Sequence, residues 1–113
     1  MPETETDPGR SVFPTGAMRS SDADACRYDL ISTVGLRRLA GAYAEGDANY
    51  PPHNWRLGLP FSNLLNHLQQ HIELFKEGDE TEDHLAHAAW GLFTLMDLSQ
   101  NMPSMDDRYV ARK

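Results

Sequence analysis

Four of the five histidines of this 113-residue chain lie between residues 67 and 87, where they form two pairs. His67 and His71 are four residues apart, and His84 and His87 are three apart. At these spacings both imidazoles of a pair project from one face of a helix. A cluster of acidic residues lies between the pairs: Glu77, Asp79, Glu80, Glu82 and Asp83. Imidazoles and carboxylates gathered in one place could bind a divalent metal or a phosphate, or transfer protons.

Two helices joined by a short turn would bring these pairs together. Ser62 is a favourable N-cap for a helix over residues 63–77, which Gly78 would end. Thr81 is a favourable N-cap for a helix over residues 82–100. Because about four residues join the two helices, we expect them to be antiparallel neighbours with the histidines near the turn.

This hairpin allows a mixed metal site of His67, His71, Asp83 and His87. Carboxylate oxygens suit Mg²⁺ or Mn²⁺, and additional imidazoles shift the preference toward Mn²⁺, Zn²⁺ or Fe²⁺. The competing interpretation is structural, because histidines beside a core stripe commonly hydrogen-bond carboxylates and cap helix ends. By position alone, Glu80 and Glu82 are typical of solvated side chains that favour the helix dipole.

The rest of the chain predicts one small helical domain over residues 25–100. Residues 1–24 have few large apolar side chains and predict a flexible arm, and residues 101–113 predict a tail or short helix. Ser32 would cap a first helix over residues 33–45, with Gly46 as its stop. The prolines of residues 47–60 argue against regular structure there. That loop contains Tyr50, His53, Asn54 and Trp55, so it would pack on the core or cover a ligand.

The last predicted helix is apolar over most of its circumference. Its stripe is Leu85, Ala88, Ala89, Leu92, Leu95 and Met96, and Trp90 and Phe93 lie off the stripe. A helix that is apolar on several sides needs several partners. We therefore expect the chain to form a homo-oligomer, either a dimer or a tetramer.

The formal net charge of −7 argues against binding to a nucleic-acid polymer, which needs a cationic surface. A small anionic ligand could still bind where a metal ion or nearby arginines make the local charge positive despite the negative net charge of the chain. The single cysteine, Cys26, fits a reducing compartment, and the chain carries no signal-peptide or membrane-span pattern. We expect a cytoplasmic protein that does not bind membranes.

Several segments together resemble a known family. They are Gly16 to Ser20, Arg27 to Ile31, Leu36 to Ala40, Tyr43 to Gly46, Asn54-Trp55, Leu64 to His67 and Glu82 to Trp90. They resemble the dATP/dGTP diphosphohydrolase N-terminal-like family of phages and prophages, which is related to the MazG-like all-α nucleoside triphosphate pyrophosphohydrolases. The resemblance implies an all-α oligomer whose helices hold a divalent metal. The metal would activate water to attack a nucleoside triphosphate, releasing a monophosphate and pyrophosphate.

The chain departs from the family pattern at several positions. MazG-like enzymes place paired acidic residues on two successive helices, where this chain offers His67, His71, Asp83 and His87. The lysine that usually precedes the family tyrosine is Asn49 here, ahead of Tyr50, and the usual asparagine after the helix tryptophan is Gly91. The residues that differ from the family pattern are expected to weaken catalysis more than ligand binding.

Two interpretations follow from the resemblance. In the first, the chain is a metal-dependent (deoxy)nucleoside triphosphate pyrophosphohydrolase that acts on purine nucleotides, located in the host cytoplasm if a phage encodes it. In the second, it is a phage protein that binds and sequesters a nucleotide, such as an immune signal, without turnover. For the first, the metal ligands would be His71, Asp83 and His87, with Mg²⁺ or Mn²⁺ preferred and Zn²⁺ possible. The catalytic side chains would be Glu77, Glu82 and His67, and the substrate contacts would be Arg19, Arg27, Tyr50, Asn54 and Trp55.

Overall fold

The computed structural model describes residues 5–7, 9–20 and 26–110, and the chain divides into two units, Met1–Ile31 and Ser32–Lys113. In the first unit, three short antiparallel strands follow one another in the sheet: β1 (Glu5–Asp7), β2 (Arg10–Val12) and β3 (Met18–Arg19). A 3-10 helix, η1, spans Tyr28–Leu30. The sequence predicts no strand in this segment, since strands of two or three residues are too short to show an alternating pattern.

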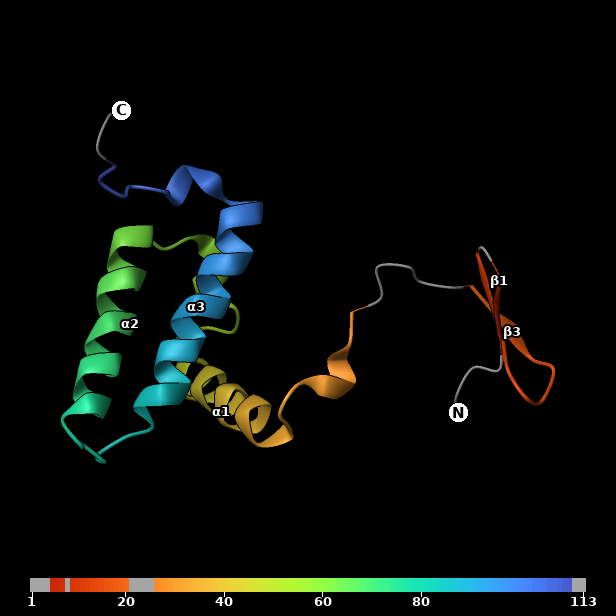
Figure 1. Ribbon diagram of the computed structural model, residues 1–113. Helices are drawn as coiled ribbons and strands as arrows, with labels where there is room; N and C mark the ends of the chain where they lie inside the picture. The colour runs from red at the N-terminus through yellow and green to blue at the C-terminus, as the bar shows by residue number, and fades with distance from the viewer. Residues whose placement is uncertain (1–4, 8, 21–25, 111–113) are drawn as a thin grey trace. The chain divides into compact units, whose positions relative to one another are not determined.

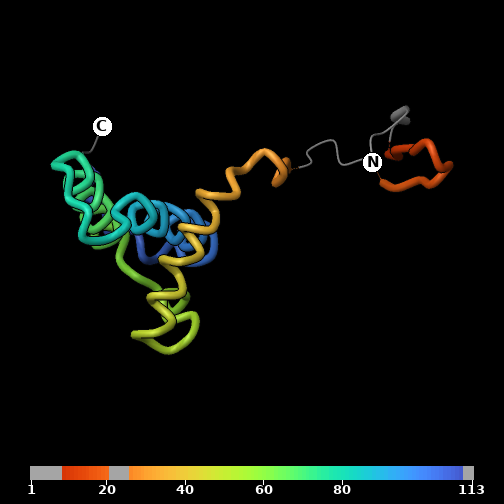
Figure 2. Tube along the Cα trace, turned by 90° about the horizontal axis from the view of Figure 1, so that it is seen from below, coloured from red at the N-terminus to blue at the C-terminus, as the bar shows by residue number. Residues whose placement is uncertain are grey.

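The second unit is helical. It contains α1 (Thr33–Asn49), η2 (Asn54–Leu57), α2 (Phe61–Lys76), α3 (His84–Asn101) and η3 (Pro103–Met105). Figure 1 shows α2 and α3 side by side as an antiparallel hairpin, with α1 packed across α3. In the view from below, the connection between α1 and α2 lies to one side of the hairpin (Figure 2). The mostly helical fold and the central hairpin are therefore confirmed.

The helix ends follow the sequence signals in part. Ser32 caps α1 as predicted, accepting a hydrogen bond from the Gly35 amide at 3.0 Å. Gly78 has the left-handed φ of 86° expected after α2. The predicted stop at Gly46 is wrong, because α1 continues to Asn49. One glycine costs a helix about 1 kcal/mol, which packing can offset.

The caps of α2 and α3 differ from the prediction. The α2 helix begins at Phe61, after Pro60, and the amide and hydroxyl of Ser62 donate to Asp107 at 2.8 and 2.6 Å. A carboxylate from the C-terminal segment thus meets the positive end of α2. Asp83, and not Thr81, caps α3. The predicted irregular loop also contains η2, whose four residues carry Asn54 and Trp55.

The core forms where the hairpin meets the segments around it. Phe61, Leu64 and Leu98 are buried together. The residues packed against them are Trp55, Leu59, Trp90, Leu95, Met102 and Met105. On α3, three members of the predicted stripe are exposed in the single chain: Leu85, Leu92 and Met96. An almost uniformly apolar helix carries little information about which face it buries. Within the described part of the chain, no helix has the length and apolar character needed to cross a membrane.

Candidate functional site

Four histidines meet at the turn of the hairpin. His71 of α2 and His84 of α3 are 6% and 3% exposed, and their Nδ1 atoms are 2.9 Å apart. The Nε2 atom of His71 lies 3.0 Å from Nε2 of His67, one turn earlier on α2. The ring of His87 stacks on His71 with the ring centroids 5.0 Å apart. The expected convergence of the two histidine pairs is therefore present.

Glu82 supplies the carboxylate at this cluster. Its Oε1 atom is 3.3 Å from Nδ1 of His71 and 3.9 Å from Nδ1 of His87. His71, Glu82 and His87 each offer one ligand atom, and these atoms lie within 4.8 Å of one another. Two imidazoles and a carboxylate are a donor set that divalent ions bind.

His87 provides a test of whether this donor set fits a metal. Its Nε2 atom is 2.6 Å from Oε2 of Glu45 on α1. Its Nδ1 atom is buried and has no hydrogen-bond partner among the described residues. A buried polar nitrogen without a partner is costly, whereas a carboxylate on the outer nitrogen is typical of metal-binding histidines. The residues present therefore fit a divalent ion.

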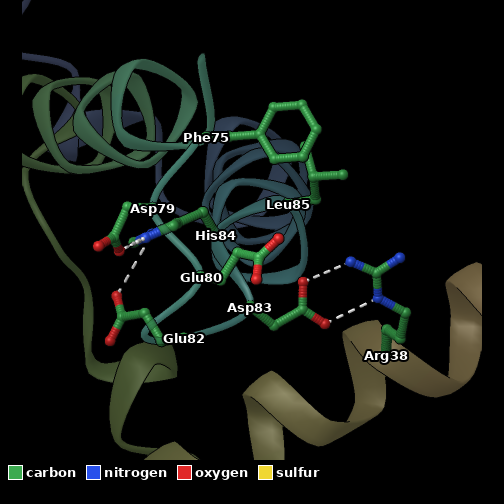
Figure 3. A pocket seen from close by; sticks show the side chains of 8 residues that line it. All are labelled: Arg38, Phe75, Asp79, Glu80, Glu82, Asp83, His84 and Leu85. Atoms are coloured by element: carbon green, nitrogen blue, oxygen red, sulfur yellow. Dashed lines mark hydrogen bonds and ion pairs between the residues drawn. The ribbon is translucent and has the colours of Figure 1, made fainter. Parts of the chain in front are cut away.

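Asp83, the carboxylate expected to bind metal, has other partners. Its two oxygens accept hydrogen bonds from Arg38 of α1 at 2.8 and 2.6 Å, and Oδ1 also accepts from the Ala86 amide. Arg38 holds the pKa of Asp83 down to about 2. Figure 3 shows Asp79 and Glu82 turned toward His84, while Asp83 points to Arg38. Glu82 thus replaces Asp83 in the candidate metal set.

Burial favours the neutral form of the central imidazole. The pKa of His71 is lowered chiefly by burial and further by the neighbouring His67 and His87, against an opposing effect of Glu82. A neutral imidazole is the form that binds metals. Asp79, beside His84 at 2.5 Å, has a lowered pKa because it accepts hydrogen bonds from Thr81 and then from His84.

The proposed catalytic side chains separate into two groups. Glu82 and His67 belong to the cluster, and their catalytic roles stay predictions. Glu77 is exposed at the C-terminal end of α2, and no described side-chain contact joins it to the histidines. Its catalytic assignment has no geometric support.

A large open groove reaches the cluster from the side of α1 and η2. Its volume is about 1290 Å³, and its lining includes Tyr50, Asn54 and Trp55 together with His67 and His87. Three predicted substrate contacts therefore share one groove with two cluster histidines. Arg19 and Arg27 belong to the first unit, where Arg27 pairs with Asp29 at 2.8 Å. Their contact with substrate stays a prediction.

Aromatic rings form a row along the groove. The ring centroid of Tyr43 lies 6.1 Å from that of Trp55 and 5.9 Å from that of Trp90. The guanidinium of Arg56 lies 4.5 Å from the Trp55 ring centroid, where it forms a cation–π contact. Sequence reasoning missed Arg56, Glu45 and the inward position of His84. The spacing of Glu45 from the histidines gives no signal, because the contact depends on α1 packing against α3.

Comparison with known proteins identifies the family. The family model described as dATP/dGTP diphosphohydrolase, N-terminal, matches residues 15–108, most of the chain. The chain belongs to this family. A "dATP/dGTP diphosphohydrolase" of Salmonella phage PMBT28 is 37% identical over 92 residues, covering 77% of this chain and 31% of the phage protein. This diphosphohydrolase-family chain thus spans about a third of the length of that relative.

The match to the diphosphohydrolase family includes the whole histidine cluster and the groove lining. No solved structure matches the chain. The expected relation to MazG-like enzymes stays a prediction.

Proposed function

We propose that the chain is a metal-dependent nucleoside triphosphate pyrophosphohydrolase that acts on purine nucleotides. Membership of the dATP/dGTP diphosphohydrolase family supports this activity. The observation that carries the proposal is that one groove contains an aromatic, amide-bearing end and two histidines of the hairpin cluster, of which His87 belongs to the candidate metal set. A base and a triphosphate could therefore occupy one continuous site.

The aromatic end suits a purine base. Tyr50 lines the groove and is 61% exposed, so its ring is available for stacking. Trp55 is partly buried against the core and already contacts Arg56, and it would form the wall. The Asn54 side chain, on the same 3-10 helix, offers a donor and an acceptor to a base edge.

The charges of the groove argue for a divalent ion. Glu45, Asp47 and Asp97 line it, against one described arginine, Arg56. These side chains alone would repel a triphosphate. An ion held by His71, Glu82 and His87 would offset that charge and polarise a phosphoryl oxygen.

The chemistry is a displacement at the α-phosphorus. Water attacks this atom, the bond to the bridging oxygen breaks, and pyrophosphate leaves from the nucleoside monophosphate. His67 lines the groove and would orient the attacking water, whose proton passes to the solvent. Its contact with His71 fixes the ring at the edge of the cluster.

One observation favours binding without turnover as a second function. The candidate metal set contains a single carboxylate, Glu82, where phosphoryl transfer with Mg²⁺ commonly uses more oxygen ligands. A protein with this groove could retain a nucleotide, such as an immune signal, and sequester it unchanged.

The test is product analysis with the purified full chain. Incubation with a panel of purine and pyrimidine nucleotides and a divalent ion should yield monophosphate and pyrophosphate, resolved by ion-exchange chromatography. Tyr50→Ala should weaken nucleotide binding roughly 5- to 150-fold, the equivalent of losing one stacking contact. Tyr50→Phe keeps the ring and should bind nearly as the unsubstituted chain does.

The two functions predict different products. Intact nucleotide recovered after heat denaturation, with no pyrophosphate formed under any divalent ion, would show sequestration. Neither products nor bound nucleotide would overturn both functions. Equal loss of binding in Tyr50→Ala and Tyr50→Phe would contradict the stacking role.

A further inference from the structure

Three imidazole nitrogens approach one carboxylate oxygen at the hairpin turn. The distances from Glu82 Oε1 are 3.3 Å to Nδ1 of His71, 3.6 Å to Nδ1 of His84 and 3.9 Å to Nδ1 of His87. In a tetrahedral zinc site with bonds of about 2.0–2.2 Å, neighbouring donor atoms are roughly 3.4 Å apart. These three separations lie near that value, whereas the Nδ1 atoms of His71 and His84, 2.9 Å apart, must move apart for both to bind one ion.

The outer nitrogen of each of these imidazoles has a partner. His84 Nε2 is 2.5 Å from Asp79, His87 Nε2 is 2.6 Å from Glu45, and His71 Nε2 is 3.0 Å from His67. A carboxylate only accepts hydrogen bonds, so it places the proton of a neutral imidazole on the outer nitrogen. The inner Nδ1 atoms of His84 and His87 then carry lone pairs: that of His84 accepts a hydrogen bond from His71, and that of His87 has no hydrogen-bond partner among the described residues. This arrangement of outer partners is typical of histidines that bind metal.

We infer that His84 joins His71, Glu82 and His87 in a centre for a zinc-type transition ion instead of Mg²⁺. Three imidazoles favour Zn²⁺ or Co²⁺, whereas Mg²⁺ requires oxygen ligands. Three nearby carboxylates, Glu45, Asp79 and Glu82, offset the charge of the ion. The inference deepens the proposed function, because it assigns the metal class and one more ligand to the same site.

The hydrogen bond between His71 and His84 must open when an ion binds. In the neutral cluster Asp79 leaves Nδ1 of His84 without a proton, so His71 carries the proton that joins the two Nδ1 atoms 2.9 Å apart. His71 can instead hold that proton on Nε2 and donate it to Nε2 of His67. The proton of His67 then lies on its own Nδ1, and the chain loses no proton overall. His67 is therefore a positioning residue for the centre.

Metal binding to the chelator-treated full chain tests the inference without any measurement of activity. Addition of Co²⁺ should produce the visible absorption bands of a tetrahedral nitrogen–oxygen site, and Zn²⁺ should displace them. Zn²⁺ should raise the melting temperature at concentrations where Mg²⁺ does not. Glu82→Gln and His84→Ala should each weaken Co²⁺ binding on the order of 100-fold or more.

Asp83→Asn is the matched control, since it alters the adjacent acidic residue and keeps the cap of α3. It should bind Co²⁺ as the unsubstituted chain does. Because His84 is buried, circular dichroism must show that His84→Ala is folded. The exposed Glu82 provides the variant that tests the site if His84→Ala is not folded.

The outcomes separate this inference from the proposed function. Unchanged Co²⁺ affinity in Glu82→Gln, an equal loss in Asp83→Asn, or Mg²⁺ binding as tight as Zn²⁺ binding would overturn the inference. Hydrolysis that needs only Mg²⁺ and is lost in Glu82→Gln would overturn it while leaving the proposed function intact. Tetrahedral Co²⁺ binding in a chain that neither hydrolyses nor binds nucleotides would support the inference and overturn the proposed function.

Discussion

Asp83 and Glu82 are neighbours in the chain, yet their carboxylates have different partners. Asp83 accepts two hydrogen bonds from Arg38 and one from the Ala86 amide, so it stabilises the start of α3. Glu82 is outside the helix and turns its carboxylate toward the histidines. At the residue scale, the hydrogen-bond partners distinguish the two acids: Asp83 is a structural carboxylate, and Glu82 is a candidate metal ligand.

Substitution of Asp83 tests this structural role. Asp83→Ala should lower the free energy of unfolding by about 1–2 kcal/mol, because it removes a helix cap. Asp83→Asn keeps the cap and should cost less than about 1 kcal/mol, since only a half-exposed ion pair is lost. Urea denaturation followed by circular dichroism measures both values, and equal losses in the two variants would contradict the capping role.

Comparison of the unsubstituted chain with Asp83→Asn should show a pH-dependent difference in the free energy of unfolding, and the pKa of Asp83 gives its sign. The pKa of Asp83 is lowered from 3.8 to about 2 in the folded chain. The ionised carboxylate therefore stabilises the fold fully at pH values above 3.8. That stabilisation is lost as the pH falls toward 2. The stability difference between the unsubstituted chain and Asp83→Asn should therefore shrink as the pH is lowered from about 6 to about 3.

At the element scale, the close approach of α2 and α3 depends on Gly91. A Cβ atom at this position would lie 2.9 Å from Cβ of Leu68, which is closer than real Cβ contacts. The two helices carry His71 and His84, so their separation also sets the distance between the candidate ligands. A side chain at position 91 would push the hairpin apart.

Gly91→Ala should therefore destabilise the chain. Overpacking costs about 1–3 kcal/mol, which exceeds the roughly 1 kcal/mol that alanine contributes to a helix. Gly41→Ala is the control, because nothing lies within 4 Å of its added Cβ atom. It should stabilise α1 by about 0.5–1 kcal/mol. Thermal denaturation of both variants measures the contrast, and a stabilised Gly91→Ala would contradict close packing at this point.

At the scale of the whole molecule, α3 leaves apolar side chains exposed after α1 and α2 have packed against it. Leu92, Phe93 and Met96 are 49%, 48% and 57% exposed. Exposed apolar side chains grouped on one helix are typical of interaction surfaces. They support the prediction of a homo-oligomer.

Light scattering on a size-exclusion column tests that prediction. The unsubstituted chain should elute with a mass that is a multiple of 12.7 kDa. Leu92→Glu should shift it toward 12.7 kDa, because a charge at this position opposes burial. Gln100→Glu, an exposed change of the same charge on the same helix, should leave the mass unchanged. A mass of 12.7 kDa for the unsubstituted chain across concentrations would contradict self-association.

The helices and the meeting of the histidine pairs could be predicted from sequence because their causes are local. Periodic apolar residues, the Ser32 cap and Gly78 act within a few neighbouring residues. A short connection forces α2 and α3 together, so the histidines on both sides of the turn must meet. The sequence could not predict which face of α3 is buried, because that helix is apolar over most of its circumference.

Tertiary structure alone decided which acids belong to the candidate site. Arg38 and Glu45 reach α3 from α1, 45 and 42 residues away in the chain, and they bind Asp83 and His87. The packing of α1 therefore draws Asp83 away from the histidines, leaves Glu82 among them, and fixes the outer nitrogen of His87. Sequence spacing favours Asp83 over Glu82 as the ligand, because Asp83 shares a helical face with His87, and only the partners that folding brings into contact reverse that order.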